Sequence, residues 1–217
     1  MMKKQFVILG TGRFGSSIAM KLMDLGAEVM VVDKDEDIIQ SMADKVTYAV
    51  QADVTDENSI QALGIRNFDT AVVTIGDDIQ SSILVTLMVK ELGLKRIIAK
   101  AQTELHAKVL YKIGADRVVF PEREMGIRVA KNLMSSNFMD FIELAPDYSI
   151  VEIAPLNDWL GQTLLSLDIR GKFGLNVMAI RKGTDINISV MANDVIEAGD
   201  IMVVIGHNDD LRKLEGN

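Results

Sequence analysis

A glycine-rich turn near the N-terminus constrains the fold more than any other feature of the sequence. Residues 7–17 read VILGTGRFGSS, so Gly10, Gly12 and Gly15 follow an apolar run and precede a helical one. In a strand–turn–helix unit, the first glycine allows the tight turn, the second lets the backbone approach a pyrophosphate, and the third lets the helix pack on the strand. The start of such a helix attracts phosphate through free N–H groups and a partial positive charge. The turn therefore predicts a nucleotide-binding site.

Two acidic residues and one arginine refine this prediction. Asp33 ends the second expected strand, where a carboxylate accepts hydrogen bonds from ribose hydroxyls and repels a 2′-phosphate, which disfavours NADP. Asp53, in VQADVTD, either approaches the adenine or caps the next helix, and the sequence leaves both roles open. The Arg13 guanidinium is suited to donate two hydrogen bonds to phosphate oxygens, but dehydrogenases also carry an arginine beside these glycines. The loop alone does not decide whether the bound molecule is a reactant or a signal.

Short apolar runs alternate with helical stretches through the first 130 or so residues, a pattern typical of βαβ units. We therefore expect an α/β fold with a Rossmann-like, doubly wound parallel sheet. The expected strands are 6–9, 28–32, 48–51, 70–74, 97–100 and 117–120, and the expected helices begin near Ser16, Glu36, Asn58, Ile79, Glu104 and Glu122.

The pattern changes after Asn132, where Ser135, Ser136 and Asn137 weaken the helix and Pro146 prevents its continuation. The expected organisation is a nucleotide-binding domain at 1–137, a crossover or hinge at 138–147, and a small C-terminal α+β lobe at 148–217. The strands expected in this lobe are 149–154, 175–181, 186–190 and 201–205, followed by a helix from Asn208.

Composition excludes several classes of protein. The sequence has no cysteine, which rules out disulfides, thiolate catalysis and cysteine-bound metals. A net charge of −8 argues against nucleic acid as a partner. The longest run without a charged residue, Ile79–Val89, is too short to span a bilayer, and the N-terminus lacks a signal segment, so we expect a cytoplasmic protein.

Two helices carry different apolar patterns. In 104–113 the residues Leu105, Val109, Leu110 and Ile113 predict a single face lying on the sheet. In 79–92 the apolar residues extend over more than one face, which predicts either a second covering subunit or a deeply covered central helix. The second helix has apolar residues at Ile79, Ile83, Leu84, Val85, Leu87, Met88, Val89 and Leu92.

Candidates for catalysis are few. The two histidines, His106 and His207, are both expected to be solvated, and the sequence contains no Ser-based elbow, HExxH motif or Tyr-x-x-x-Lys pair. A tail of about 70 residues is also small for a substrate domain. These observations favour a binding protein over an oxidoreductase.

Six segments give the chain a resemblance to a known family. They are VILGTGRFGSSIA, NFDTAVVTIGDDIQSSILVTLMVKELG, IIAKAQ, KIGADRVVFPE, SLDIRGKFGLNVMAI and VIEAGDIMVVIG, in this order over nearly the whole chain. Together they resemble the RCK/TrkA family of cytosolic regulatory subunits of bacterial Ktr/Trk potassium uptake systems. The resemblance implies dimers assembled into an octameric ring, docked on the cytoplasmic face of a membrane-embedded potassium-translocating subunit and governed by ATP or ADP.

The resemblance also implies roles for particular residues. Lys100 corresponds to a phosphate-side lysine, and Glu122 to a carboxylate near the phosphates that can join a divalent or monovalent cation site at the dimer interface; from sequence alone Glu122 is simply a first-turn helix acid. Phe138, Met139, Phe141, Ile142 and Leu144 correspond to an exchanged crossover segment, or to ordinary core. The full set expected to bind nucleotide is Gly10, Gly12, Arg13, Phe14, Gly15, Asp33, Lys34, Asp53, Val54, Ile75, Gly76, Lys100 and Glu122.

In the tail, Ile169, Arg170 and Asn176 match positions that bind cyclic di-AMP in related subunits, although Met191 stands where some relatives have proline. The expected function is thus an ATP/ADP-sensing regulatory subunit without catalysis of its own. A small NAD-dependent oxidoreductase and a nucleotide-binding regulator of another cation transporter remain as alternatives, because spacing does not separate ATP or ADP from NAD or NADH.

Overall fold

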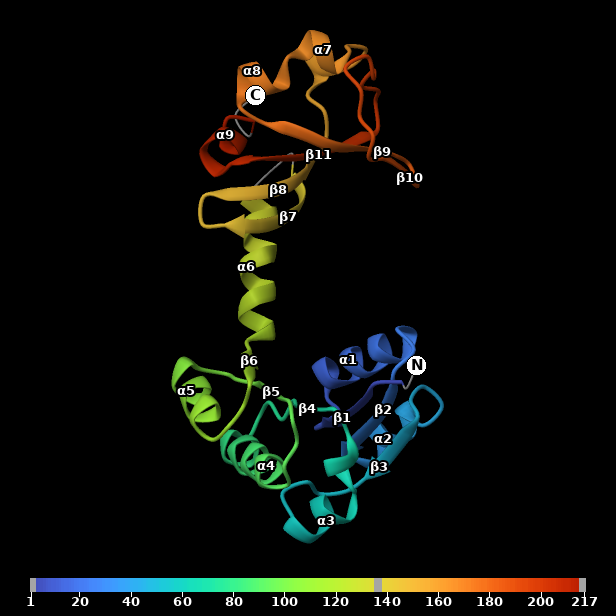
Figure 1. Ribbon diagram of the computed structural model, residues 1–217, viewed down its shortest axis with the longest axis vertical. Coiled ribbons are helices and arrows are strands. Elements are labelled where there is room, and N and C mark those ends of the chain that lie inside the picture. Colours follow the sequence, from blue (N-terminus) through green and yellow to red (C-terminus); the bar gives the residue numbers. More distant parts are fainter. Residues whose placement is uncertain (1–2, 135–137, 215–217) are drawn as a thin grey trace. The chain divides into compact units, whose positions relative to one another are not determined.

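The chain consists of two compact units, Met1–Glu122 and Arg123–Asn217. The structure, a computed structural model, describes residues 3–134 and 138–214 (Figure 1). Each unit has its own sheet and its own core.

The first unit contains a six-stranded, fully parallel sheet of order β3-β2-β1-β4-β5-β6. This is the order of a doubly wound dinucleotide-binding fold, so the predicted fold class is confirmed. Each strand agrees with its predicted range to within one residue at either end. The strands are β1 (Gln5–Leu9), β2 (Glu28–Asp33), β3 (Tyr48–Gln51), β4 (Thr70–Val73), β5 (Ile97–Lys100) and β6 (Arg117–Val119).

Helices follow each strand of this sheet, and most begin at a side chain that accepts hydrogen bonds from the first free N–H groups. Asp35, Asp56, Asp78 and Thr103 have this capping role. The helices are α1 (Arg13–Asp24), α2 (Glu36–Met42), α3 (Glu57–Ala62), η1 (Ile65–Asn67), α4 (Ile79–Glu91), α5 (Glu104–Lys112) and α6 (Pro121–Met134).

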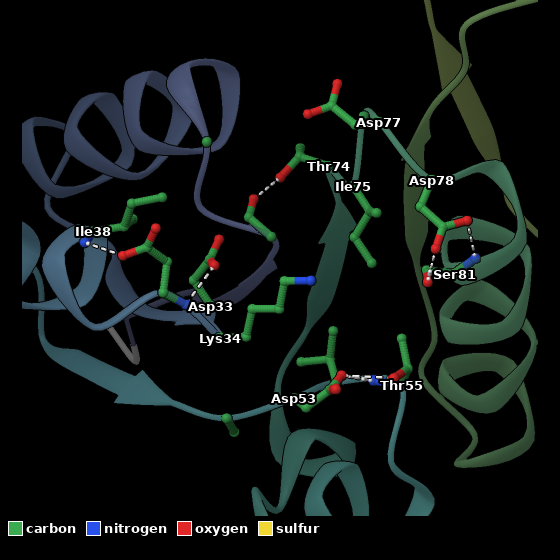
Figure 2. A pocket seen from close by; sticks show the side chains of 16 residues that line it. Asp33, Lys34, Ile38, Asp53, Thr55, Thr74, Ile75, Asp77, Asp78 and Ser81 are labelled. Carbon is green, nitrogen blue, oxygen red and sulfur yellow. Dashed lines mark hydrogen bonds between the residues drawn. The ribbon is translucent and has the colours of Figure 1, made fainter.

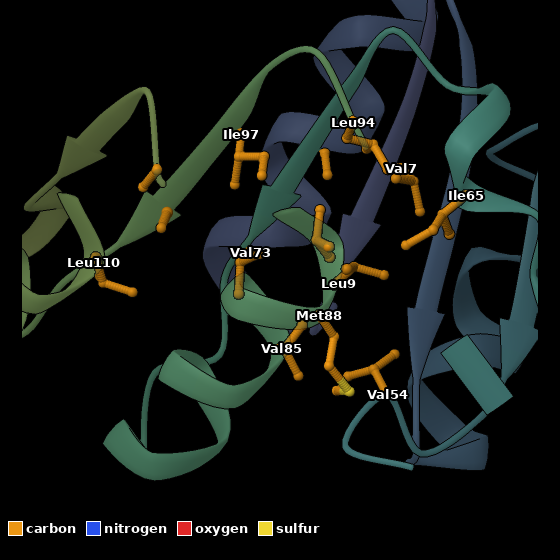
Figure 3. Close-up of a cluster of buried hydrophobic side chains, with 14 of the residues drawn as sticks. Val7, Leu9, Val54, Ile65, Val73, Val85, Met88, Leu94, Ile97 and Leu110 are labelled. Carbon is orange, nitrogen blue, oxygen red and sulfur yellow. The ribbon is translucent and has the colours of Figure 1, made fainter. Parts of the chain in front are cut away.

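Apolar side chains cover both faces of the parallel sheet, as expected for strands that are buried on two sides. Along β1, Val7 and Leu9 belong to one core cluster and Ile8 to another, because successive side chains point to opposite faces. Figure 3 shows the first cluster, in which Val85 of α4 packs with Val73 and other strand residues. The sheet is therefore held between helices, with its strand ends free for a ligand.

The structure corrects two predictions about helices: α4 is not covered on all sides within this chain, and α5 buries a different face from the expected one. In α4, Val85 and Val89 are fully buried in the core of the unit, whereas Leu84 and Leu87 are 44% and 38% exposed. In α5, Leu105 is exposed and His106, expected to be solvated, is only 3% exposed. The buried residues of α5 are His106, Ala107 and Leu110, so the helix is rotated by about one residue from the expected face.

The second unit is an antiparallel sheet of order β10-β9-β11-β8-β7 with short helices around a core that includes Trp159. The predicted α+β lobe is confirmed, but residues 138–145, expected as a hinge, form strand β7 paired with β8. The side chains of Phe138, Met139 and Phe141 lie outside the described residues. The elements are β7 (Phe138–Ala145), β8 (Tyr148–Ile153), η2 (Asn157–Trp159), α7 (Leu164–Leu167), α8 (Ile169–Phe173), β9 (Asn176–Lys182), β10 (Asp185–Asn187), β11 (Asp200–His207) and α9 (Asn208–Arg212).

Candidate functional site

A cavity of about 390 Å³ lies at the carboxyl ends of β1, β2, β3 and β4. The order of the sheet reverses between β1 and β4, and ligands of open α/β sheets bind at such a switch point. The volume is within the range of small-molecule sites. Figure 2 shows the side chains around this cavity.

The glycine loop forms one wall and has the geometry that its spacing predicts. Gly10 has a φ of +87°, a region that side chains rarely adopt. A Cβ on Gly15 would lie 2.5 Å from the Gly10 carbonyl oxygen, so only glycine lets α1 pack this closely. Gly12 faces open space, with no atom within 4 Å of an added Cβ. The backbone at Gly12 is thus accessible to a ligand.

The start of α1 offers hydrogen-bond donors at the same place. The N–H of Ser16 donates to the carbonyl oxygen of Gly12 over 2.9 Å, which is the first bond of the helix. The N–H groups of Arg13, Phe14 and Gly15 precede this bond and have no acceptor within the helix. They form an anion-binding end of the kind used for phosphates.

Asp33 connects the end of β2 to the glycine loop. Its Oδ2 accepts from the N–H of Thr11 at 2.6 Å, and its Oδ1 accepts from the N–H of Asp35 at 3.0 Å. The carboxylate is half-buried and lines the cavity. Asp33 therefore fixes the loop position and presents its carboxylate where a ribose would lie.

Asp53 lines the cavity from the end of β3 and does not cap α3. The cap of α3 is Asp56, whose carboxylate accepts from the N–H of Ser59. Asp53 instead accepts from the hydroxyl of Thr55 at 2.6 Å and from its N–H at 2.9 Å. These bonds, with the charge of Lys34, keep the pKa of Asp53 below its usual value.

Three charged residues gather outside the cavity wall, beside Gly76. The Lys100 ammonium lies 2.5 Å from a carboxylate oxygen of Glu122, and an added Cβ on Gly76 would lie 3.3 Å from the same ammonium. Lys100 is 13% exposed and Glu122 is 72% exposed. The hydrogen bond from Lys100 lowers the pKa of Glu122, and the charge of Arg13 lowers it further. Arg13, Lys100 and Glu122 thus form a charge cluster next to the loop after β4.

The predicted nucleotide-binding residues fall into two groups. Five of them do not line the cavity: Arg13, Phe14, Gly15, Lys100 and Glu122. All of these except Phe14 lie beside the cavity, as the close approaches and charge interactions described above show. The residues that do line it are Gly10, Gly12, Asp33, Lys34, Asp53, Val54, Ile75 and Gly76.

Sequence reasoning missed several other lining residues. Their shared signal is position, because each lies within a few residues of a strand's carboxyl end or in the first turns of the helix that follows. These residues are Asp35, Ile38, Ala52, Thr55, Thr74, Asp77, Asp78 and Ser81.

No cluster of three or more His, Asp or Glu side chains forms a metal site within residues 3–134 and 138–214. Glu122 forms an ion pair with Lys100, whose ammonium has no lone pair with which to bind a metal ion. The expected cation role of Glu122 stays a prediction.

A second cavity, of about 530 Å³, lies in the C-terminal unit. Ile169, Arg170 and Asn176, the residues expected to bind a second ligand, all line it. Asp168, between α7 and α8, also lines it and has a φ of +46°, in the left-handed region that few residues other than glycine, asparagine and aspartate adopt. Sequence reasoning did not identify Leu164, Leu165, Asp168, Leu175, Val177 or Ala192.

Comparisons with known proteins agree with both units. The TrkA-N domain model matches residues 6–121, and the TrkA-C domain model matches residues 148–216. The chain is 48% identical to Ktr system potassium uptake protein C of Bacillus subtilis (strain 168) over 214 residues, covering 99% of this chain and 97% of that protein. It is 42% identical to Ktr system potassium uptake protein A of the same organism over 212 residues, covering 98% and 96%.

Among solved structures, the RCK domain of GsuK matches with a TM-score of 0.67 and 19% identity. The match covers 99% of this chain and 47% of that chain, and it shows the likeness of fold. The chain therefore belongs to the RCK/TrkA family, with a TrkA-N domain followed by a TrkA-C domain, and is related over its whole length to the Ktr system potassium uptake proteins.

Proposed function

We propose that this protein is an adenine-nucleotide-sensing regulatory subunit that gates a membrane potassium transporter or channel and performs no catalysis of its own. The observation that supports this most is the cavity at the switch point of the sheet, in a chain that matches potassium uptake proteins from end to end. The names of those relatives indicate the process that the subunit serves.

ATP and ADP are the ligands that this proposal assigns to the cavity. Asp33 receives the ribose, and the glycine loop with the start of α1 receives the phosphates. The cavity wall contains five aspartates and a lysine, which disfavours placing phosphates there. The phosphate chain is therefore directed toward Arg13 and Lys100 outside the wall. NAD or NADH stays the alternative ligand, since the GsuK channel, whose fold is similar, has been solved bound to NAD.

The partner in this proposal is a membrane-embedded potassium-translocating subunit. None of the helices in the described part of the chain has the length and apolarity needed to cross a membrane. The protein would act at the inner face of the cell membrane, as dimers assembled into an octameric ring. Glu122, released from Lys100 by a phosphate, would then be free to hold a cation at the dimer interface.

The test combines binding with flux. The nucleotide that co-purifies with the protein is identified, ATP and ADP are titrated by calorimetry, and potassium uptake is measured in vesicles that contain the membrane subunit. We expect both nucleotides to bind and only one of them to support rapid uptake. Steady oxidation of NADH with any hydride acceptor would instead establish an oxidoreductase.

A second ligand is proposed for the C-terminal cavity, with cyclic di-AMP as the candidate. All three residues expected for this ligand line the same cavity, with the Arg170 guanidinium suited to a phosphate and the Asn176 amide suited to a base edge. This ligand would act through the TrkA-C domain, separately from the nucleotide.

A further inference from the structure

Three residues directly after β4 lie between the glycine loop and the charge cluster, and the chain then leads into α4. Thr74, Ile75 and Gly76 follow the last residue of β4, and all three line the nucleotide cavity. Residues 74–76 are called the connector below. Its contacts on either side show which parts of the site it joins.

On one side the connector is packed against the glycine loop. The hydroxyl of Thr74 donates a hydrogen bond to the carbonyl oxygen of Gly10 (Figure 2), and the N–H of Thr74 donates to the carbonyl oxygen of Leu9 at 2.9 Å. Thr74 is only 6% exposed, so water competes little for these bonds. An added Cβ on Gly15 would lie 2.7 Å from the Thr74 hydroxyl oxygen, and one on Gly10 would lie 3.0 Å from a side-chain carbon of Ile75. The loop and the connector are therefore in direct contact, with little room for either to shift alone.

On the other side the connector meets the charge cluster. Gly76 leaves space for the Lys100 ammonium, which would lie 3.3 Å from an added Cβ. Lys100 is also the partner of Glu122. The two groups proposed to receive phosphates, the start of α1 and the charge cluster, thus border the connector from opposite sides.

The connector continues into α4 through the cap of that helix. Asp78, two residues after the connector, accepts from the N–H of Gln80 at 2.9 Å and from the N–H of Ser81 at 3.1 Å. The hydroxyl of Ser81 donates to the second carboxylate oxygen at 2.6 Å. These bonds fix the first turn of α4 to the chain that leaves the connector. The same helix carries the exposed Leu84 and Leu87.

We propose that Thr74 is a positioning residue that ties the glycine loop to α4, so that a nucleotide which orders the loop also stabilises α4. This role rests on the proposed function, because it requires phosphates at the glycine loop. The hydroxyl holds the Gly10 carbonyl, and with it the left-handed turn that precedes the start of α1. Without the hydroxyl, the nucleotide must order the loop by itself, which costs affinity. Movements of the loop then no longer reach the connector.

The first measurement compares a ligand that has phosphates with one that has none. ADP is titrated into the full-length protein by calorimetry, and adenosine is measured by its competition with ADP. Thr74→Val removes the hydroxyl and should weaken ADP binding by roughly threefold to tenfold, the effect of one lost hydrogen bond. Adenosine affinity should not change, because the hydroxyl acts on the loop that receives phosphates. Thr74→Ser, which keeps the hydroxyl, should restore the affinity for ADP.

A matched control lies at the other end of the same strand. Thr70, the first residue of β4, is also buried. Thr70→Val makes the same chemical change far from the glycine loop and should alter neither affinity. Circular dichroism confirms that each variant is folded.

The second measurement follows α4 itself. Hydrogen exchange is recorded by mass spectrometry in residues 83–91 of α4, none of which lines the cavity, with and without saturating ADP. In the wild-type protein we expect ADP to slow exchange in this segment, because ordering of the loop is passed on through the connector. Thr74→Val at the same occupancy should lose this effect, and Thr74→Ser should keep it.

The outcomes separate this proposal from the proposed function. A Thr74→Val variant with either wild-type affinity for ADP or a wild-type exchange response overturns the role of Thr74. Equal losses of ADP and adenosine affinity would make the residue merely structural and overturn it as well. Wild-type protein that binds ADP without a change of exchange in residues 83–91 overturns the link to α4 and leaves the nucleotide site intact. Wild-type protein that does not bind ADP overturns the proposed function itself.

Discussion

At the scale of single residues, the arginine of the glycine loop has the most informative position. Arg13 does not line the cavity, yet its charge lowers the pKa of Glu122, which pairs with Lys100. ATP and ADP share adenine, ribose and two phosphates, so the cavity should hold those parts of both alike. A ligand shifts a conformational equilibrium only by its differential affinity for the two states. Under the proposed function, discrimination between ATP and ADP would therefore depend on Arg13 and Lys100, the cations beyond the cavity wall.

We predict that Arg13→Ala preserves ADP affinity and weakens ATP binding by about tenfold to a hundredfold, the effect of a lost charge-assisted hydrogen bond of about 1.5–3 kcal/mol. ATP-stimulated potassium uptake should be lost with it. Calorimetric titration of both nucleotides and vesicle flux measure these effects, with Lys21→Ala in the last turn of the same helix as the control. Equal losses for both nucleotides would make Arg13 a general phosphate clamp.

His106 is a buried titrating group that makes the free energy of unfolding depend on pH. It accepts a hydrogen bond at Nδ1 from the N–H of Gln102 at 3.4 Å, and its Nε2 is a buried atom without a partner in the described structure. Burial lowers its pKa below the usual value near 6.5. The unfolded chain therefore binds a proton more readily than the folded one as the pH falls below about 6.5.

We predict that the protein loses stability on acidification from pH 7 to 5.5, with this histidine contributing at most about 1.4 kcal/mol per pH unit. Urea denaturation at several pH values gives the free energy of unfolding as a function of pH. This free energy should fall less steeply with acidification in His106→Leu than in the wild type. His207→Leu, at a half-buried position in the other unit, is the control. Parallel slopes in all three proteins would contradict the role of His106.

At the scale of elements, α4 separates what pattern can predict from what it cannot. Its apolar residues predicted either a second covering subunit or a deeply covered central helix, but not which residues face the core. The exposed Leu84 and Leu87 show that the second alternative is wrong, and the covering subunit stays a prediction. In the structure Val85, Met88 and Val89 pack on the sheet, and Leu84 and Leu87 are left on the exposed side. Because apolar residues occur on every side of the helix and the polar Ser82 and Thr86 are themselves buried, the helix has no polar stripe that would fix its rotation.

We predict that Leu84→Glu, alone or with Leu87→Glu, splits the assembly while the protein stays folded, because a charge at an apolar subunit contact is costly to desolvate. Light scattering gives the mass. Val85→Glu should instead unfold the N-terminal unit, since Val85 is fully buried. Leu25→Glu changes an exposed leucine elsewhere and should alter neither the mass of the assembly nor the folding of the N-terminal unit. An oligomer that survives both substitutions in α4 would exclude this surface.

The strands of the two units were predictable to different extents. In the parallel sheet, short apolar runs separated by helices indicate each strand and a doubly wound parallel arrangement. In the C-terminal unit, β7 was read as a hinge because the residues on either side of it favour a break, and α7 and α8 are too short for a helical period to show. Arg13 was predicted from its place in the glycine loop, and Lys100 and Glu122 were predicted by resemblance. The meeting of the three depends on side-chain positions that no spacing rule describes.

At the scale of the whole molecule, the protein has one candidate ligand cavity described in each unit. The two cavities share no residue, so the two ligands proposed above would bind to different parts of the chain. A regulatory subunit with this organisation can integrate two signals, provided that each ligand has different affinities for the conformations of the assembly.

We predict that Arg170→Ala removes cyclic di-AMP binding and leaves ATP and ADP affinities unchanged, because the guanidinium belongs to the C-terminal cavity alone. Calorimetry with all three ligands tests this, and Lys172→Ala on the same short helix serves as the control. Wild-type protein without measurable affinity for cyclic di-AMP at micromolar concentration would remove this ligand from the C-terminal cavity.

The aspartates around the nucleotide cavity have a consequence for the solution in which the protein works. Most phosphate sites lose affinity as salt is added, because their cations are screened. Here Arg13 and Lys100 are the proposed phosphate contacts, but five carboxylates and a lysine surround the cavity in a chain of net charge −8, so we expect screening to relieve more repulsion than the attraction it weakens. Between about 0.01 and 0.15 M salt the Debye length falls from roughly 30 to 8 Å, and adenine-nucleotide affinity, followed by calorimetry in potassium chloride, should rise over this range. The protein would then bind its adenine nucleotide more tightly in a cell that has already accumulated potassium salts than in a cell depleted of them.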